Sequence, residues 1–173
     1  MSFFGLDLAQ KGLSLYSVNN PLKFISSCDD THHRQIPAAL VLAMAPHAFA
    51  SGAAGKLYDP ATPRKLQTAV ASDDKLDKII AERIHRAKAA SENAFETLGF
   101  YAAAVVAATV AGVDARLVNL LSLGYIGSRI LFNIVYVRLQ DNRNWAPVRS
   151  LSWMVGIGIT FTLYIKAAGQ FAS

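Results

Sequence analysis

The sequence predicts an all-α integral membrane protein, built as a bundle of four transmembrane helices. Hydrophobic residues make up 53% of its 173 residues and gather in long runs, without the polar alternation of a soluble fold. Four of these runs approach the roughly 20 apolar residues that span a bilayer. They cover residues 36–55, 89–112, 117–136 and 151–172.

A soluble bundle with unusually apolar helices is the alternative, because alanine-rich runs such as YAAAVVAATVAG imitate a membrane span. The fourth run argues against it. Residues 151–172 carry no charge before Lys166, whereas a helix of a soluble bundle keeps a polar face. We therefore predict a four-helix membrane domain over residues 36–173, preceded by an N-terminal extension, residues 1–35, whose structure the sequence does not assign.

The first predicted span contains two prolines. Pro37 suits the first turn of a helix that begins at Ile36, because the N–H that proline lacks has no helical partner there. Pro46 lies inside the span and is expected to kink it. His47 beside it is interpreted as a packed interior residue in preference to a catalyst.

The second predicted helix begins in water and enters the bilayer near Ala89. Residues 56–75 are rich in Pro, Asp, Lys and Thr and are predicted to form a loop, and helical periodicity starts at Leu76. Helical offsets then place four polar or aromatic side chains on one face. They are Arg86, Asn93, Glu96 and Phe100.

Glu96 is the acidic residue that lies deepest in any predicted span. A carboxylate that faces lipid costs several kcal/mol, so such groups usually face a bundle interior, a partner or a polar cavity. The other interpretation is a helix end still in the aqueous loop, with its charges solvated. The sequence leaves both open.

The third predicted span places a cation well inside the membrane, at Arg129. A seven-residue offset puts Arg129 on one face with Tyr136, together with Phe132 and Asn133. A cation at this depth needs an anionic partner or ligand, and Glu96 is the candidate on a neighbouring helix. An Arg129–Glu96 salt bridge that only holds the bundle together is the structural alternative.

The charge distribution predicts the topology. Lys and Arg concentrate in residues 56–88 and 138–149, whereas the connection at residues 112–116 is nearly neutral. By the positive-inside tendency, these two basic loops face the cytosol and both termini lie on the other side. The net charge of +5 is therefore interpreted as a membrane signal, and no nucleic acid is expected as a partner.

The remaining polar residues exclude several kinds of site. Cys28 is alone, so no internal disulfide forms and a thiol nucleophile, where needed, comes from elsewhere. The four histidines do not share metal-ligand spacing with carboxylates or cysteine, so no metal site is predicted. The first residues lack a basic segment followed by a long apolar core, so no cleavable signal peptide is expected.

Three motifs occur in order along the predicted helices. They are NAFE at residues 93–96, GSR at residues 127–129 with Tyr136 seven residues after the arginine, and APVRS at residues 146–150. Together they resemble the MAPEG family, the membrane-associated proteins in eicosanoid and glutathione metabolism, over about residues 36–166. Within that family they are similar to the microsomal glutathione transferase and prostaglandin E synthase branches.

The resemblance implies a homotrimer in the endoplasmic reticulum membrane, with glutathione bound between neighbouring subunits near the cytosolic face. It implies catalytic roles for Tyr136, Arg149 and Ser150, and cofactor-binding roles for Lys56, Arg86, Asn93, Glu96 and Arg129. In this set the carboxylate binds the glutathione ammonium group and the cations bind its carboxylates or thiolate. The amide and the phenol add hydrogen bonds, and Ser150 donates to the sulfur.

Three positions depart from the family pattern. Ala89 stands where an arginine is common, Phe132 where relatives are often polar, and Trp153 where the prostaglandin branch has tyrosine. The leading interpretation is a glutathione-dependent transferase, peroxidase or isomerase that acts on a lipophilic electrophile from the bilayer. Two alternatives stay open: a non-catalytic trimeric scaffold, and a glutathione-independent isomerase or cyclase of secondary metabolism.

Overall fold

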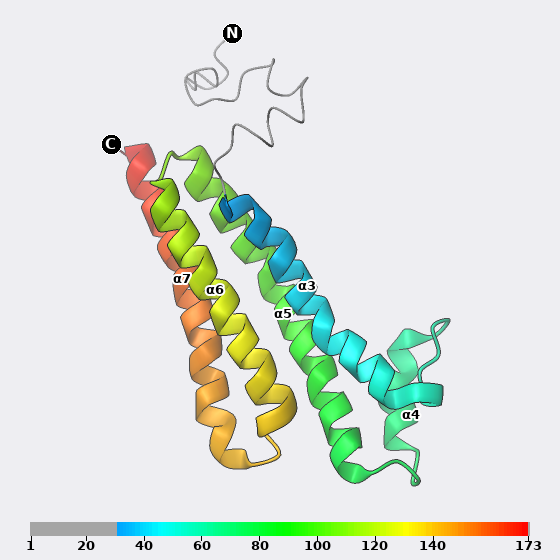
Figure 1. Cartoon of the computed structure of the whole chain (residues 1–173). Coiled ribbons are helices and arrows are strands. Elements are labelled where there is room, and N and C mark those ends of the chain that lie inside the picture. The colour runs from blue at the N-terminus through cyan, green and yellow to red at the C-terminus, as the bar shows by residue number, and fades with distance from the viewer. Residues whose placement is uncertain (1–30, 173) are drawn as a thin grey trace.

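The computed structural model describes residues 31–172 and consists mainly of four long helices (Figure 1). Each helix is long and apolar enough to cross a membrane. The predicted all-helical fold with four membrane-competent spans is therefore confirmed. The helices are α3 (Thr31–Ala54), α5 (Lys78–Val110), α6 (Ala115–Ile134) and α7 (Ala146–Ala172).

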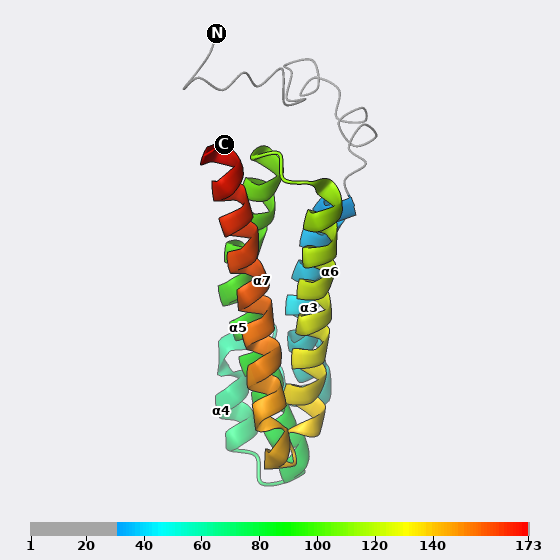
Figure 2. The same cartoon turned by 90° about the vertical axis from the view of Figure 1, so that its left-hand side faces the viewer.

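The four helices alternate in direction, so the start of α3 and the end of α7 lie at the same end of the bundle (Figures 1 and 2). The central helices α5 and α6 pack against each other, and each also packs against α3 and α7. We call the opposite end, which carries α4 and the α6–α7 connection, the basic end, because residues 56–88 and 138–149 lie there.

The basic end is more ordered than the predicted loop. Residues 56–75 contain most of η1 (Gly55–Leu57), all of η2 (Pro63–Lys65) and α4 (Leu66–Ala71). Leu66 and Val70 of α4 are buried in a cluster with Ile84 and Ala87 of α5. The loop prediction was wrong for residues 63–71, because one apolar pair four residues apart is too short a pattern to reveal a helix.

The start of the first helix also differs from the prediction. The helix α3 begins at Thr31, so Pro37 lies inside it and not in its first turn. The last five residues of the proposed extension 1–35 therefore belong to this helix, and residues 1–30, including Cys28, lie outside the described part of the chain. The boundary between extension and domain stays a prediction.

Polar side chains from two helices compensate for Pro46 inside α3. Because proline has no N–H, the carbonyl of Leu42 four residues earlier loses its helical donor. The amide nitrogen of Asn133 on α6 donates to that carbonyl at 3.0 Å. The hydroxyl of Ser91 on α5 donates to the next carbonyl, that of Ala43, at 2.8 Å. These bonds tie α3 to the central pair of helices.

The helix α5 is longer than the membrane requires. Its 33 residues extend about 50 Å at 1.5 Å per residue, against a hydrocarbon core of about 30 Å. It starts two residues after the predicted Leu76, where the Asp77 carboxylate accepts hydrogen bonds from the amides of Ile79 and Ile80. Its first turns contact α4 and the α6–α7 connection and so support the basic end.

Candidate functional site

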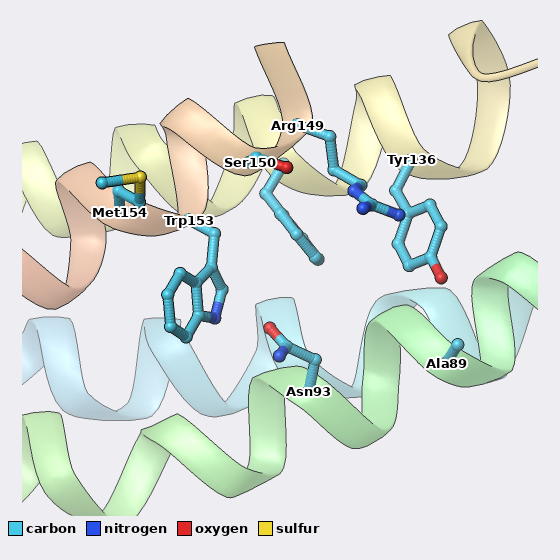
Figure 3. Close-up of a pocket in the computed structure, with 8 residues that line it drawn as sticks. Ala89, Asn93, Tyr136, Arg149, Ser150, Trp153 and Met154 are labelled. Atoms are coloured by element: carbon cyan, nitrogen blue, oxygen red, sulfur yellow. The ribbon is translucent and has the colours of Figure 1, made fainter. Parts of the chain in front are cut away.

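A pocket of about 530 Å³ opens between α5, α6 and α7 towards the basic end (Figure 3). Its volume lies within the range of roughly 300–1,000 Å³ that is usual for small-molecule sites. None of its lining side chains is acidic. They are Ala89, Asn93, Phe132, Tyr136, Arg149, Ser150, Trp153 and Met154.

Four predicted site residues meet in this pocket, from three separate segments. Asn93 comes from α5, Tyr136 from the end of the third span, and Arg149 and Ser150 from the first turns of α7. Tyr136 lies in η3 (Val135–Leu139), a π-helical continuation of α6. Segments of π-helix are rare and often occur at functional sites.

The Arg149 guanidinium is the pocket's own cation. Its carbon atom lies 4.7 Å from the centroid of the Tyr136 ring, and Figure 3 shows the two side chains together. Within the described residues Arg149 forms no ion pair and its side chain no hydrogen bond. A cation over an aromatic face, with its N–H groups uncommitted, is well placed to bind an anion.

Arg129 lies behind the pocket wall. Its side chain is only 3% exposed, and its Nη1 donates to the side-chain oxygen of Asn93 at 3.4 Å. The rings of Tyr125 and Phe132 lie 5.1 and 5.8 Å from the guanidinium carbon. Its Nε and Nη2 have no hydrogen-bond partner among residues 31–172. The cation is therefore held mainly by aromatic faces.

Glu96 does not partner Arg129. The Glu96 side chain is exposed, does not line the pocket, and forms no ion pair within the part of the chain that the structure describes. Asn93 and Glu96 are three residues apart and thus about 60° apart around the helix, so only Asn93 turns into the bundle. The Arg129–Glu96 salt bridge suggested as an alternative is absent from residues 31–172.

Arg86 and Lys56 also lie outside the pocket. Arg86 forms an ion pair with Asp141 in the α6–α7 connection, together with Arg83, and a longer one with Glu82 at 3.6 Å. These bonds hold the connection against α5. Lys56 is exposed at the end of α3 and does not line the pocket. Their predicted contacts with a ligand stay predictions.

The pocket also contains features that sequence reasoning did not assign to a site. Met154 lines it, one helical turn after Ser150. That four-residue spacing could have predicted Met154 as a lining residue, because residues four apart share a helix face. Trp153, noted in the sequence as a departure from the tyrosine of the prostaglandin branch, also lines the wall, and its indole N–H is buried without a hydrogen-bond partner among the described residues. Asn133, expected beside Tyr136, turns instead towards α3.

The pocket thus has one cation in its lining and further N–H donors in or behind its wall. Arg149 lines it, and the buried donors of Arg129 and Trp153 lack partners among residues 31–172. A site with this balance suits a ligand that carries carboxylates, carbonyls or a thiolate.

The family model for the MAPEG family matches residues 36–169, which is most of the chain. The chain belongs to the MAPEG family. Comparisons with curated proteins and with solved structures gave no match. The MAPEG family includes glutathione transferases and synthases, so membership indicates a membrane protein with a function related to glutathione.

The three departures from the MAPEG pattern all lie at the pocket. Ala89, Phe132 and Trp153 form part of its wall. Two of them are apolar, and the third offers a single N–H donor and no acceptor. The wall around the cation is therefore less polar than the resemblance alone would imply.

Proposed function

We propose that this MAPEG protein is a membrane-bound, glutathione-dependent transferase, peroxidase or isomerase that acts on a lipophilic electrophile. The observation that carries the proposal is the meeting of Asn93, Tyr136, Arg149 and Ser150 in one pocket without acidic lining. Glutathione, when bound, supplies a thiol that acts as nucleophile or reductant. The residues of the chain determine how that thiol is held and in which protonation state.

The donors around the pocket support glutathione as the ligand, and this support is independent of family membership. Glutathione carries two carboxylates and two peptide carbonyls, which need cations and N–H donors. Within the described residues the Arg149 guanidinium that lines the pocket is unpaired, and the buried indole N–H of Trp153 in its wall has no hydrogen-bond partner. The Nδ2 of Asn93 adds a further donor, because it makes no hydrogen bond within the described residues.

The proposed catalytic effect of the chain is to favour the thiolate. A nearby cation and a hydroxyl donor lower a thiol pKa by stabilising its charged form. Arg149 and Ser150 are adjacent in sequence and both line the pocket, so they can act on one sulfur. The Tyr136 ring keeps the guanidinium in place, and its hydroxyl is the candidate proton donor to the second substrate.

The second substrate is proposed to enter from the bilayer. Met154 and Trp153 form the apolar side of the pocket, and Met154 is 62% exposed on α7. A lipophilic molecule dissolved in the membrane can therefore approach the thiol without crossing water. We place the protein in the endoplasmic reticulum membrane, with the basic end and the pocket facing the cytosol and both termini facing the lumen.

We further propose a homotrimer in which a neighbouring subunit completes the site. Glu96 supports this, because it is an exposed carboxylate inside α5 with no ion-pair partner among residues 31–172. A charged group at that depth is costly in lipid and is expected to face a partner or a polar ligand. Glu96 would then bind the ammonium group of glutathione, and Lys56 would reach the site of a neighbour.

Isothermal titration of the full-length protein in detergent with glutathione tests the proposal. Binding in the millimolar range or tighter is expected, and it should weaken at least ~10-fold in Arg149→Ala, because a charge-assisted hydrogen bond is lost. Glu96→Gln should also weaken binding. No detectable binding up to several millimolar would reject glutathione as the ligand. Equal binding by wild type and Glu96→Gln would reject the site in which Glu96 binds the ammonium group.

A non-catalytic scaffold or a glutathione-independent isomerase is the second candidate. The observation that favours it is the wall made by Ala89, Phe132 and Trp153, which leaves few polar groups around the cation. Conjugation of chlorodinitrobenzene and reduction of a lipid hydroperoxide separate the candidates. Glutathione-dependent turnover that Arg149→Ala abolishes excludes the second candidate, whereas binding of lipophilic compounds without any such turnover supports it.

A further inference from the structure

The buried Arg129 contacts the oxygen of the Asn93 side-chain amide and leaves its NH₂ group free of that contact. A guanidinium has five N–H donors and no acceptor, so any group that bonds to it must present an acceptor. Asn93 presents its side-chain oxygen to Arg129 Nη1 at 3.4 Å. The Asn93 NH₂ group is then the free end of the amide, and it makes no hydrogen bond within residues 31–172. Because Asn93 lines the pocket, that free donor is available to a ligand.

Arg129 can occupy its place only because α7 has no side chain at position 156. A Cβ atom added to Gly156 would lie 2.7 Å from Arg129 Nη2 and 3.1 Å from its Nε. It would also lie 2.9 Å from the hydroxyl oxygen of Ser128. Gly156 is buried in the contact between α6 and α7, so an added methyl group must displace the guanidinium.

A second glycine on the same helix provides a matched comparison. A Cβ atom added to Gly158 would have no neighbour within 4 Å. Both positions are in the middle of α7, so an alanine gains the same helix propensity at each. Any difference between the two alanine variants therefore reports on Arg129 and its surroundings.

We propose that Gly156 is a positioning residue of the glutathione site. It leaves the space in which Arg129 lies, and Arg129 in turn fixes Asn93 with its NH₂ group available to the pocket. That group then donates a hydrogen bond to a carboxylate or peptide-carbonyl oxygen of the bound tripeptide. The inference rests on the proposed function for the identity of the ligand, whereas the relation between Gly156, Arg129 and Asn93 is independent of it.

Titration of the full-length variants with glutathione tests the role in binding. Gly156→Ala is expected to weaken binding at least ~10-fold, and Gly158→Ala less than ~2-fold. Asn93→Ala should weaken binding in the wild-type and Gly158→Ala backgrounds, but should add less than ~2-fold to Gly156→Ala, because the amide is already misplaced. Equal affinities of the two glycine variants, or fully additive effects of Gly156→Ala and Asn93→Ala, would overturn the proposal.

Two further measurements keep the test decisive. Arg129→Leu removes the donor that holds Asn93, so it should reproduce the loss of affinity even where Gly156→Ala fails to fold. Thermal unfolding without ligand gives a double-mutant cycle of Gly156→Ala and Arg129→Leu. We expect Gly156→Ala to lower the unfolding midpoint more in the wild type than in the Arg129→Leu background. Absence of this coupling refutes the Gly156 inference, whereas coupling without any glutathione binding by the wild type refutes the proposed function alone.

Discussion

Arg149 lies with its guanidinium carbon 4.7 Å from the centre of the Tyr136 ring, and this contact joins the start of α7 to the end of the third span. A cation over an aromatic face contributes roughly 0.5–2 kcal/mol. We therefore expect Tyr136→Leu to weaken glutathione binding by roughly 2- to 30-fold, because the cation loses its fixed position. Tyr136→Phe keeps the ring and is expected to bind within about 3-fold of wild type. Titration calorimetry measures both.

The chain contains a matched control for this contact. Arg138 lies 5.0 Å from the centre of the Phe49 ring on α3, and neither side chain lines the pocket. Phe49→Leu removes the same kind of interaction at the same end of the bundle and should leave the affinity for glutathione unchanged. Equal effects of Phe49→Leu and Tyr136→Leu would show that the Tyr136 contact has no special role in binding.

Asn133 is expected to stabilise α3 through the carbonyl that Pro46 leaves without a helical donor. Asn133→Ala removes the 3.0 Å hydrogen bond to Leu42 and leaves a part-buried acceptor unpaired, which costs at most about 1–3 kcal/mol. Pro46→Ala restores a backbone N–H to the same carbonyl. Asn133→Ala should therefore lower the unfolding midpoint clearly in the wild type and much less in Pro46→Ala. Additive effects of the two substitutions would contradict this account.

Asp141 should make the stability of the basic end depend on pH. Hydrogen bonds from Arg83 and then Arg86 lower the pKa of Asp141 below its ordinary value. Because the folded-state pKa lies below the unfolded-state pKa, the stabilisation is complete above about pH 5 and is lost as the pH falls through the folded-state pKa. Asp141→Asn should have a lower unfolding midpoint than wild type at pH 7, and the difference should shrink towards pH 3.

Asp74 supplies the control for that titration. It is exposed and forms no ion pair within the described residues, so Asp74→Asn should follow the wild-type profile. A difference between wild type and Asp141→Asn that stays constant from pH 7 to pH 3 would show that Asp141 does not act through its charge.

The helices could be predicted from the sequence because their signal is long and local. Each span is a run of apolar residues of sufficient length, and the start of α5 was placed within two residues because helical periodicity begins at Leu76. The residues that meet in the pocket were named because motifs of a known family mark them. The short helix α4 and the true start of α3 were missed, since neither has a pattern of comparable length.

The contacts around the site could not be predicted, because they join residues that are distant in sequence. Asp141 and Arg86 are 55 residues apart, and Asn133 and Leu42 are 91 apart. The choice of Asn93 over Glu96 as the partner of Arg129 depends on a rotation of about 60° around α5, which helical spacing does not determine. The space beside Gly156 likewise exists only once α6 and α7 are packed.

Trp153 is expected to gain a hydrogen-bond partner when glutathione binds. Its indole N–H is buried in the pocket wall and has no partner among residues 31–172, a cost of about 1–3 kcal/mol that a ligand oxygen or sulfur can remove. Trp153→Phe removes the donor and keeps an aromatic ring. The rise in unfolding midpoint on adding saturating glutathione should therefore be smaller in Trp153→Phe than in wild type.

Trp145 makes this last experiment specific. It is 38% exposed in η4 (Arg143–Trp145) and does not line the pocket, so Trp145→Phe should show the full wild-type rise with glutathione. An equal rise in all three proteins would mean that the ligand leaves the Trp153 N–H unpaired. The unpaired Trp153 N–H would then destabilise the protein with and without ligand, and the ligand would be bound through the Arg149 side of the pocket alone.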